Sequence, residues 1–207
     1  MAPPPNPFRC PPGPYERACQ IAMYLQEKKP KSKLIIMDSK DKFSKQGLFT
    51  QAFERYFPNH VEWVSASNGG KITRVDAAAG TLYAGDTAHK ADVANVIPAQ
   101  QAGAIAMKAG LTNDSGWCPI DGRTFESTIH KAVHVVGDAS IAAPLPKSGY
   151  AANSEGKSCA AAVVALLNGQ EVTDPSLVNT CYSVVGPDDA ISVAMVYDLK
   201  DGKLSKV

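Results

Sequence analysis

The segment His134–Leu167, HVVGDASIAAPLPKSGYAANSEGKSCAAAVVALL, decides the fold of this chain. Its apolar start, His134–Val136, predicts a short buried strand, and Gly137-Asp138 follows directly. A proline-containing loop then leads to an alanine-rich helix predicted from Gly149 to Leu167. A carboxylate between a strand end and a helix start can accept hydrogen bonds from ligand hydroxyls, while the helix N–H groups face electron-rich atoms. An ordinary strand-turn-helix with a capping aspartate fits the same residues.

The composition is that of an ordinary globular protein without electrostatic bias. The chain has 207 residues, of which 44% are hydrophobic and 20% charged, and its formal net charge is +1. Such a chain has no electrostatic reason to bind nucleic acid or an anionic membrane surface. No apolar run reaches the ~20 residues of a membrane-spanning helix, and the first residues, MAPPPNPF, lack the regions of a signal peptide. We therefore expect no nucleic-acid partner and no membrane span.

Five cysteines occur without the spacing of a metal site or of haem attachment. The sequence has no CxxC, no CxxCH and no Cys/His cluster, which excludes a c-type haem attached to this chain and predicts no metal site. Cys19 and Cys159 lie among alanines in predicted helices, and we interpret them as small core residues. His130 and His134 lack the spacing of a hydrolase triad, and we interpret them as packing or hydrogen-bonding residues.

The first hundred residues alternate helical and β-rich patterns. Residues 2–14 contain seven prolines and predict a stiff, extended loop. A helix with one apolar face is predicted at Tyr15–Lys28, and a buried strand at Leu34–Asp38. Ala91–Pro98 is predicted to form another buried strand. An apolar helix face is expected from Phe49, Phe53 and Phe57, and a small meander from Val61–Val64, Lys71–Asp76 and Thr81–Gly85.

Asp38 ends the predicted strand at the position where the acid of a dinucleotide-binding unit contacts a ribose. However, Pro11, Pro12 and Pro14 stand before the first predicted helix where such units have GxGxxG. A tight approach to pyrophosphate needs glycine backbones there, so nicotinamide dinucleotide binding is disfavoured. We interpret Asp38 as a strand-end carboxylate in solvent.

The later part of the chain predicts a short helix at Ala102–Gly110 and a turn-rich stretch at Leu111–Thr128. After the helix that ends at Leu167, two strands are predicted at Asn179–Val185 and Ala190–Asp198, joined by a turn.

The order of four sequence blocks resembles the flavoprotein subunit of flavocytochrome c sulfide dehydrogenase. The blocks are PFRCPPGPYERA at 7–18, AGLTNDSGWCPID at 109–121, HKAVHVVGDASIAAPLPKSGYAANSEGK at 130–157 and NTCYS at 179–183. The resemblance implies an α/β fold with two Rossmann-like dinucleotide-binding domains. It divides this chain into a degenerate NAD-binding-like central domain (2–100), a returning segment of the FAD-binding domain (101–170) and the start of a C-terminal α+β interface domain (171–207).

The family resemblance also implies an activity. Such proteins carry FAD and a redox-active disulfide, oxidise sulfide to sulfur or polysulfide in the periplasm, and pass electrons to a c-type cytochrome subunit that holds the haem. In this chain the redox pair falls on Cys10 and Cys181. Glu16 matches an acid that can accept a proton from hydrosulfide, and a helix-stabilising carboxylate is the alternative reading.

The flavin contacts implied by the resemblance cluster around the opening segment. Asp138 is expected to hold ribityl hydroxyls and Gly137 to allow close backbone approach. The helix start is expected to face the pyrimidine edge of the flavin through Lys147, Ser148 and Gly149, although Lys147 also fits a solvated loop charge. Further contacts are expected from Pro98 and Gln100.

The family's N-terminal FAD domain, with its GxGxxG and the cysteine that tethers the flavin, does not match any part of this sequence. We therefore expect a fragment that holds part of an FAD site and binds FAD weakly by itself. Two alternatives stay open. One is a sulfide:quinone oxidoreductase with the same fold and cysteine chemistry, and the other is a catalytically silent fragment or electron-transfer docking module.

Overall fold

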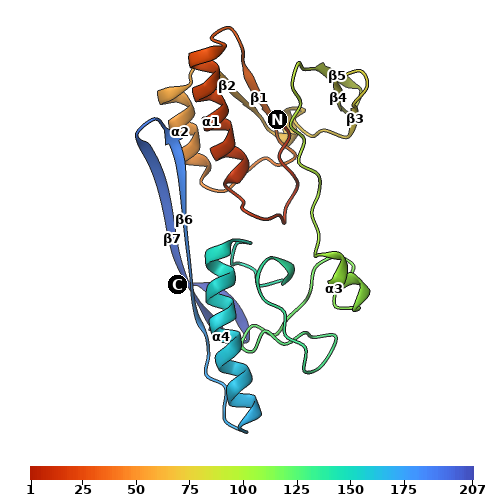
Figure 1. Cartoon of the computed structure of the whole chain (residues 1–207), viewed down its shortest axis with the longest axis vertical. Coiled ribbons are helices and arrows are strands. Elements are labelled where there is room, and N and C mark those ends of the chain that lie inside the picture. Colours follow the sequence, from red (N-terminus) through yellow and green to blue (C-terminus); the bar gives the residue numbers. More distant parts are fainter. The chain divides into compact units, whose positions relative to one another are not determined.

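The computed structural model describes residues 1–207, which form two compact units (Figure 1). Unit 1 comprises Met1–Ala99 and Tyr182–Ile191, and unit 2 comprises Gln100–Cys181 and Ser192–Val207. Both contain helices and small sheets, so the α/β class predicted from the sequence is confirmed. The three regions expected from the family resemblance stay a prediction.

A two-stranded parallel sheet lies at the centre of unit 1. β1 (Leu34–Met37) pairs with β2 (Val61–Val64), and the connection between them contains α2 (Gln46–Tyr56). Parallel strands need such a crossover because a tight hairpin reverses the chain direction. α1 (Gly13–Lys28) packs against β1 and α2 (Figure 1). The 3-10 helix η1 (Ala66–Asn68) follows β2.

The core of unit 1 is rich in aromatic side chains. Phe49 and Phe57 have no exposed surface and Phe53 has 7%, so their four-residue spacing marks a buried face, as predicted. Tyr15 is fully buried and stacks on Phe43, with ring centroids 3.7 Å apart. Ring pairs of this kind stabilise a core by roughly 0.5–1.5 kcal/mol beyond their buried area.

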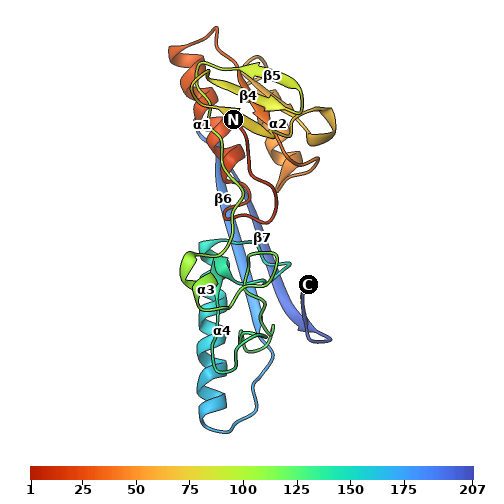
Figure 2. The same cartoon turned by 90° about the vertical axis from the view of Figure 1, so that its right-hand side faces the viewer.

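The small antiparallel sheet of unit 1 differs from the meander that the sequence predicts. Its three antiparallel strands are β3 (Arg74–Asp76), β4 (Thr81–Ala84) and β5 (Thr87–Lys90), all labelled in Figure 1. Figure 2 shows β4 and β5 from the side. The placement of Val61–Val64 in this meander is wrong because that segment pairs with β1. The third strand, β5, is short and polar, so apolar alternation does not reveal it.

The buried strand predicted at Ala91–Pro98 is also wrong. Only Val96 forms a β-bridge, with Ala2, and the side chain of Val93 is 85% exposed. The segment is apolar in sequence but has no neighbouring strand along its length.

Residues from late in the chain complete unit 1. Val185 is 1% exposed within the aromatic core. The Tyr56 hydroxyl donates to Asp189 at 2.8 Å, and a Cβ at Gly186 would lie 3.1 Å from the ring of Tyr56. The turn between Gly186 and Asp189 therefore packs on α2.

The longest helix of unit 2 is α4 (Gly149–Leu167), which spans the residues predicted for it. The C-terminal strands β6 (Ser176–Gly186), β7 (Asp189–Lys200) and β8 (Lys203–Lys206) form a sheet in that order. β6 and β7 are labelled in Figure 1. β6 and β7 contain the two predicted strands, and each of them has residues in both units. α3 (Ala104–Lys108) matches the predicted short helix. None of the helices combines the length and hydropathy needed to cross a membrane.

The strand predicted at His134–Val136 does not form. His134 makes one β-bridge, with Glu126, and Val136 is 39% exposed. Its neighbours are loops with isolated bridges, which provide no continuous ladder for a three-residue apolar run. The ring of His134 contacts the Thr124 carbonyl at 2.9 Å, consistent with the hydrogen-bonding interpretation.

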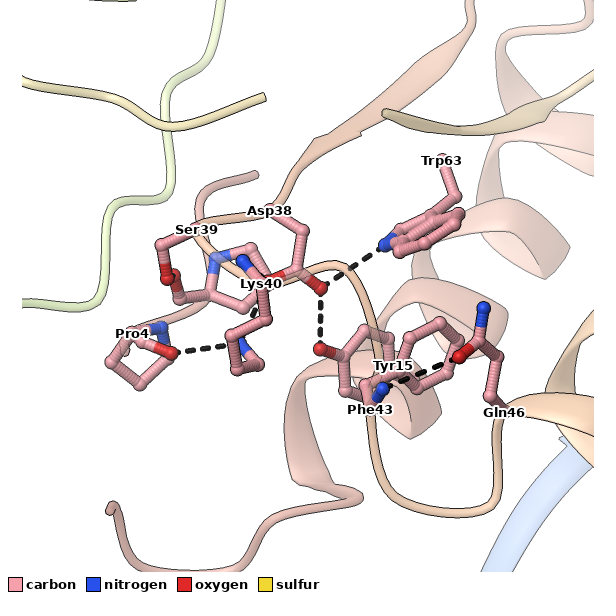
Figure 3. Close-up of polar contacts among 9 residues, drawn as sticks. Pro4, Tyr15, Asp38, Ser39, Lys40, Phe43, Gln46 and Trp63 are labelled. Carbon is pink, nitrogen blue, oxygen red and sulfur yellow. Dashed lines mark hydrogen bonds and ion pairs between the residues drawn. The ribbon is translucent and has the colours of Figure 1, made fainter. Parts of the chain in front are cut away.

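Asp38 was expected in solvent, but it is fully buried at the C-terminal end of β1. Its Oδ2 accepts from the Tyr15 hydroxyl at 2.5 Å and from Trp63 Nε1 at 3.0 Å (Figure 3). Its Oδ1 accepts from Lys40 Nζ at 2.7 Å and from the Lys40 N–H at 3.1 Å. Lys40 Nζ also donates to the Pro4 carbonyl at 2.8 Å. The carboxylate is thus saturated by protein donors and holds unit 1 together instead of contacting a ribose.

We predict that Asp38→Ala destabilises unit 1 by about 3–5 kcal/mol, because it leaves a nearly buried ammonium without its counter-charge. Urea denaturation followed by tryptophan fluorescence measures the free energy of unfolding. The matched control is Asp86→Ala, which removes an exposed carboxylate and is expected to change stability by less than about 0.5 kcal/mol. Equal effects of the two substitutions would contradict the structural role of Asp38.

Candidate functional site

The candidate site lies in unit 2, around the 3-10 helix η2 (Gly137–Ala139). Gly137 has φ of 73°, a left-handed conformation that favours glycine, and a Cβ there would lie 3.1 Å from Ala152 Cβ of α4. Its N–H donates to Glu155 Oε2 at 2.6 Å, and the Ser140 hydroxyl reaches the same oxygen at 3.4 Å. Because Glu155 is only 2% exposed, its carboxylate fixes η2 firmly against α4.

Asp138 has an unmet hydrogen-bonding capacity. Its Oδ1 is buried and has no hydrogen-bond partner. A buried acceptor without a donor costs about 1–3 kcal/mol, and a hydroxyl group from a ligand would remove that cost. The residue therefore fits the ribityl-binding role that the family resemblance implies, and that role stays a prediction.

Lys147 holds the loop between η2 and α4. Its ammonium donates to the carbonyls of Asp138 at 2.8 Å and Ser140 at 2.7 Å, and lies 3.8 Å from the centroid of the Trp117 ring. Burial lowers the pKa of Lys147, while the carboxylates of Asp138 and Glu155 oppose that shift. The alternative reading of Lys147 as a solvated loop charge is wrong.

The start of α4 is capped by Ser148. Its Oγ accepts the Ala151 N–H at 3.1 Å and donates to Asn179 Oδ1 on β6 at 2.5 Å. Gly149 follows, exposed, and no atom lies within 4 Å of the position a Cβ would occupy. The first N–H groups of a helix lack partners within the helix, so this end of α4 can face an electron-rich ligand.

Cys181 is connected to the same helix start. Asn179 is 5% exposed, and its Nδ2 lies 3.5 Å from Cys181 Sγ. Since Asn179 also accepts from Ser148, one hydrogen-bonded series joins the cap of α4 to the thiol of Cys181. Tyr197 is 3% exposed, and its pKa is raised by burial and by the charge of Cys181.

Cys10 belongs to unit 1 and lies at the start of α1. Its φ is 54°, and its carbonyl accepts the Gly13 N–H at 2.8 Å. A Cβ at Gly13 would lie 3.1 Å from Cys10 Sγ, so glycine at this position makes room for the sulfur. The side chain of Cys10 is exposed. The proposed pair Cys10–Cys181 joins residues of the two units and stays a prediction.

Glu16 also lies in unit 1, on the first turn of α1. Its Oε1 accepts the Val184 N–H at 2.9 Å, which ties α1 to β6. Burial, assisted by the charge of Glu16, raises the pKa of Cys19 to about 12. Cys19 therefore stays a protonated core thiol at neutral pH, as its interpretation as a core residue requires.

The two remaining predicted contacts lie in different units. Pro98 is exposed in unit 1, and Gln100 is half-buried in unit 2. Their approach to a flavin stays a prediction.

Sequence reasoning missed Glu155 and Asn179. Glu155 interrupts an apolar helical stripe, because Ala151 and Cys159 lie four residues before and after it and all three are buried. A charge within such a stripe is the signal that could have found it. Asn179 alternates with the fully buried Leu177 on β6, which places a polar side chain on the inward face.

Two family models match this chain. One describes the central part of the sulfide dehydrogenase [flavocytochrome c] flavoprotein chain and matches residues 1–98. The other describes the flavin-binding part of flavocytochrome c sulphide dehydrogenase and matches residues 173–207. The second match includes both Asn179 and Cys181, and it supports a flavin as the cofactor.

The fold is also similar to that of a solved structure. A chain in the cryo-EM structure of the Tetrahymena thermophila mitochondrial ATP synthase, a composite F1Fo tetramer, matches with a TM-score of 0.68 at 18% sequence identity. The match covers 93% of the present chain and 49% of that chain, so the present chain spans about half its length. At this identity the likeness concerns the fold alone.

We predict that the free energy of unfolding of Glu155→Gln increases relative to that of the wild type as the pH rises. Burial raises the pKa of Glu155 above its ordinary value of 4.5. Between 4.5 and the raised value, the folded chain binds more protons than the unfolded chain, so the wild type loses stability with increasing pH. Glutamine has no proton to lose in this window.

Urea denaturation of both proteins at several pH values between about 4 and 8 measures this difference. Glu171→Gln, at an exposed position, is the control and is expected to show no such trend. A difference between Glu155→Gln and wild type that stays flat, or falls with pH, would show that the burial of Glu155 does not raise its pKa.

Proposed function

Since this chain belongs to the flavoprotein chains of flavocytochrome c sulfide dehydrogenase, we propose that it takes part in FAD-dependent oxidation of sulfide. In this proposal the complete protein has two dinucleotide-binding domains, acts in the periplasm and passes electrons to a c-type cytochrome subunit that carries haem. Its product is sulfur or polysulfide. The family is one of flavoprotein oxidoreductases.

The observation that carries the proposal is the hydrogen-bonded series from Ser148 through Asn179 to Cys181. The family resemblance assigns Ser148 to the flavin and Cys181 to the redox pair for separate reasons. Within unit 2, one buried amide contacts both side chains. A thiol beside a flavin-facing helix start is what electron transfer from sulfur to flavin requires.

The residues around η2 and the start of α4 fit a flavin. Asp138 Oδ1 has the unmet acceptor that a ribityl hydroxyl would satisfy, and the backbone of Gly137 allows close approach. Lys147 keeps this loop in place and adds positive charge near the helix start, where Ser148 and Gly149 would face the ligand. FAD, when bound, supplies the two-electron acceptor.

The sulfur chemistry assigned to Cys10 and Cys181 is thiol–disulfide exchange. Hydrosulfide attacks one sulfur of the oxidised pair, the disulfide bond breaks, and a persulfide and a thiolate result without net oxidation. Reforming the disulfide with release of one sulfur atom in oxidation state zero gives up one proton and two electrons. The electrons pass through the flavin to the cytochrome.

Glu16 is proposed as the proton acceptor for this exchange. One of its oxygens accepts the Val184 N–H, which orients the carboxylate. A carboxylate has about four lone-pair sites, so this hydrogen bond leaves acceptor capacity for a proton from hydrosulfide.

We predict that Cys181→Ser lowers sulfide-dependent cytochrome c reduction by the full-length protein about a thousandfold, because serine cannot form the disulfide. Stopped-flow absorbance of the haem measures the rate. Cys159→Ala, in the α4 core, is the matched control and keeps turnover close to wild type. Normal turnover in Cys181→Ser would rule out the disulfide mechanism. A parallel assay with a soluble quinone tests the other electron acceptor.

We predict that Asp138→Ala weakens flavin retention by roughly tenfold or more, since a hydrogen bond to a charged group contributes about 1.5–3 kcal/mol. The absorbance of the flavin relative to protein, after unfolding in graded urea and desalting, measures retention in the full-length protein. Asp174→Ala removes an exposed carboxylate of the same unit and serves as the control. Identical retention in both variants would exclude Asp138 from the flavin site.

A further inference from the structure

The orientation of the Asn179 amide is determined by its neighbour. Ser148 Oγ accepts the Ala151 N–H, so the hydroxyl hydrogen of Ser148 points to another acceptor, which is Asn179 Oδ1 at 2.5 Å. The carbonyl side of the amide is therefore directed to α4. The NH₂ side is directed to Cys181, with Nδ2 3.5 Å from Sγ.

The Asn179 amide offers a hydrogen-bond donor to Cys181 Sγ. A thiolate accepts a hydrogen bond from the Asn179 NH₂ group. A neutral thiol accepts only a weaker hydrogen bond, and its own S–H has Oδ1 at 3.7 Å, an oxygen that it shares with Ser148. Because Asn179 is 5% exposed, water competes little with the donor, and a hydrogen bond to an ionised partner is strengthened.

Tyr197, on β7, is a titratable group that interacts with Cys181. Its raised pKa keeps the phenol neutral up to about pH 10, so it adds no negative charge beside the sulfur. Tyr197 therefore does not oppose a negative charge on Cys181 below that pH.

We propose that Asn179 is a positioning residue that stabilises the thiolate of Cys181 and fixes its sulfur beside the start of α4. The inference rests on the proposed function for its purpose, since a stabilised thiolate is a better leaving group in disulfide exchange. The hydrogen bond from Asn179 to Cys181 can be tested on this protein without sulfide and without the cytochrome.

The test is the rate of Cys181 alkylation by iodoacetamide in the reduced full-length protein, without sulfide, mapped by peptide mass spectrometry. Asn179→Asp keeps the shape of the side chain and the acceptor for Ser148 but replaces the donor with a negative oxygen. We expect alkylation at pH 7 to fall about tenfold, as a hydrogen-bond loss of about 1.4 kcal/mol predicts. At pH 10, above the ordinary cysteine pKa, the rates are expected to agree within about twofold.

Two further variants separate the donor effect from packing. Asn179→Ala is expected to slow alkylation at pH 7 in the same direction, whereas a loosened site would expose the thiol and speed it. Asn153→Ala, at an exposed position on α4, is the matched control and leaves the rate unchanged. An unchanged or faster rate in Asn179→Asp at pH 7, or a deficit that persists at pH 10, would overturn the proposal.

The experiment distinguishes this inference from the proposed function. If Cys181→Ser keeps normal sulfide turnover while Asn179→Asp slows alkylation, the disulfide mechanism is wrong and the role of Asn179 stands. If Cys181→Ser loses turnover but Asn179→Asp leaves alkylation unchanged, the reverse holds.

Discussion

A carboxylate taken out of water needs donors around it, and Asp38 imposes that requirement on unit 1. Its four hydrogen bonds come from α1, from β2 and from the segment after β1, so three parts of the chain converge on one charge. Through Lys40 the same charge also fixes the proline-rich N-terminal loop at Pro4. The parallel strands place Asp38 and Trp63 close enough to meet, and the aromatic core packs around that arrangement.

Unit 2 also contains a buried carboxylate, but its surroundings are not fully hydrogen-bonded. Glu155 is buried on α4 and binds the backbone of Gly137, which keeps η2 against the helix. Unlike Asp38, it leaves a neighbouring group unsatisfied, since Asp138 Oδ1 lacks a donor. The hydrogen-bonding capacity of Asp38 is thus met within unit 1. Glu155 instead holds a loop in which Asp138 Oδ1 can still accept a hydrogen bond from a ligand. Lys147 and Ser148 lie beside that loop and give the helix start its polar lining.

The sequence predicted the elements that have long, regular patterns. Its predictions were wrong where the structure of a segment depends on residues far away in the chain. α1, α4 and the phenylalanine stripe follow from helical periodicity, and the C-terminal hairpin from β-rich runs. His134–Val136 is too short to form a strand without a partner ladder. The burial of Asp38 depends on Tyr15 and Trp63, 23 and 25 residues away, which no local pattern reveals. For the same reason the family resemblance pointed to Ser148 and Cys181 but not to the amide between them.

The contribution of Tyr182–Ile191 to unit 1 has a consequence for how the chain folds. Glu16 on α1 meets Val184 across 168 positions, and Val185 fills part of the aromatic core. During synthesis the first hundred residues leave the ribosome long before this segment, so unit 1 has to wait with an incomplete core. Closing so long a loop is slow compared with forming local helices. Unit 1 therefore completes its core only after most of the chain has been made, and an incomplete aromatic core favours aggregation until then.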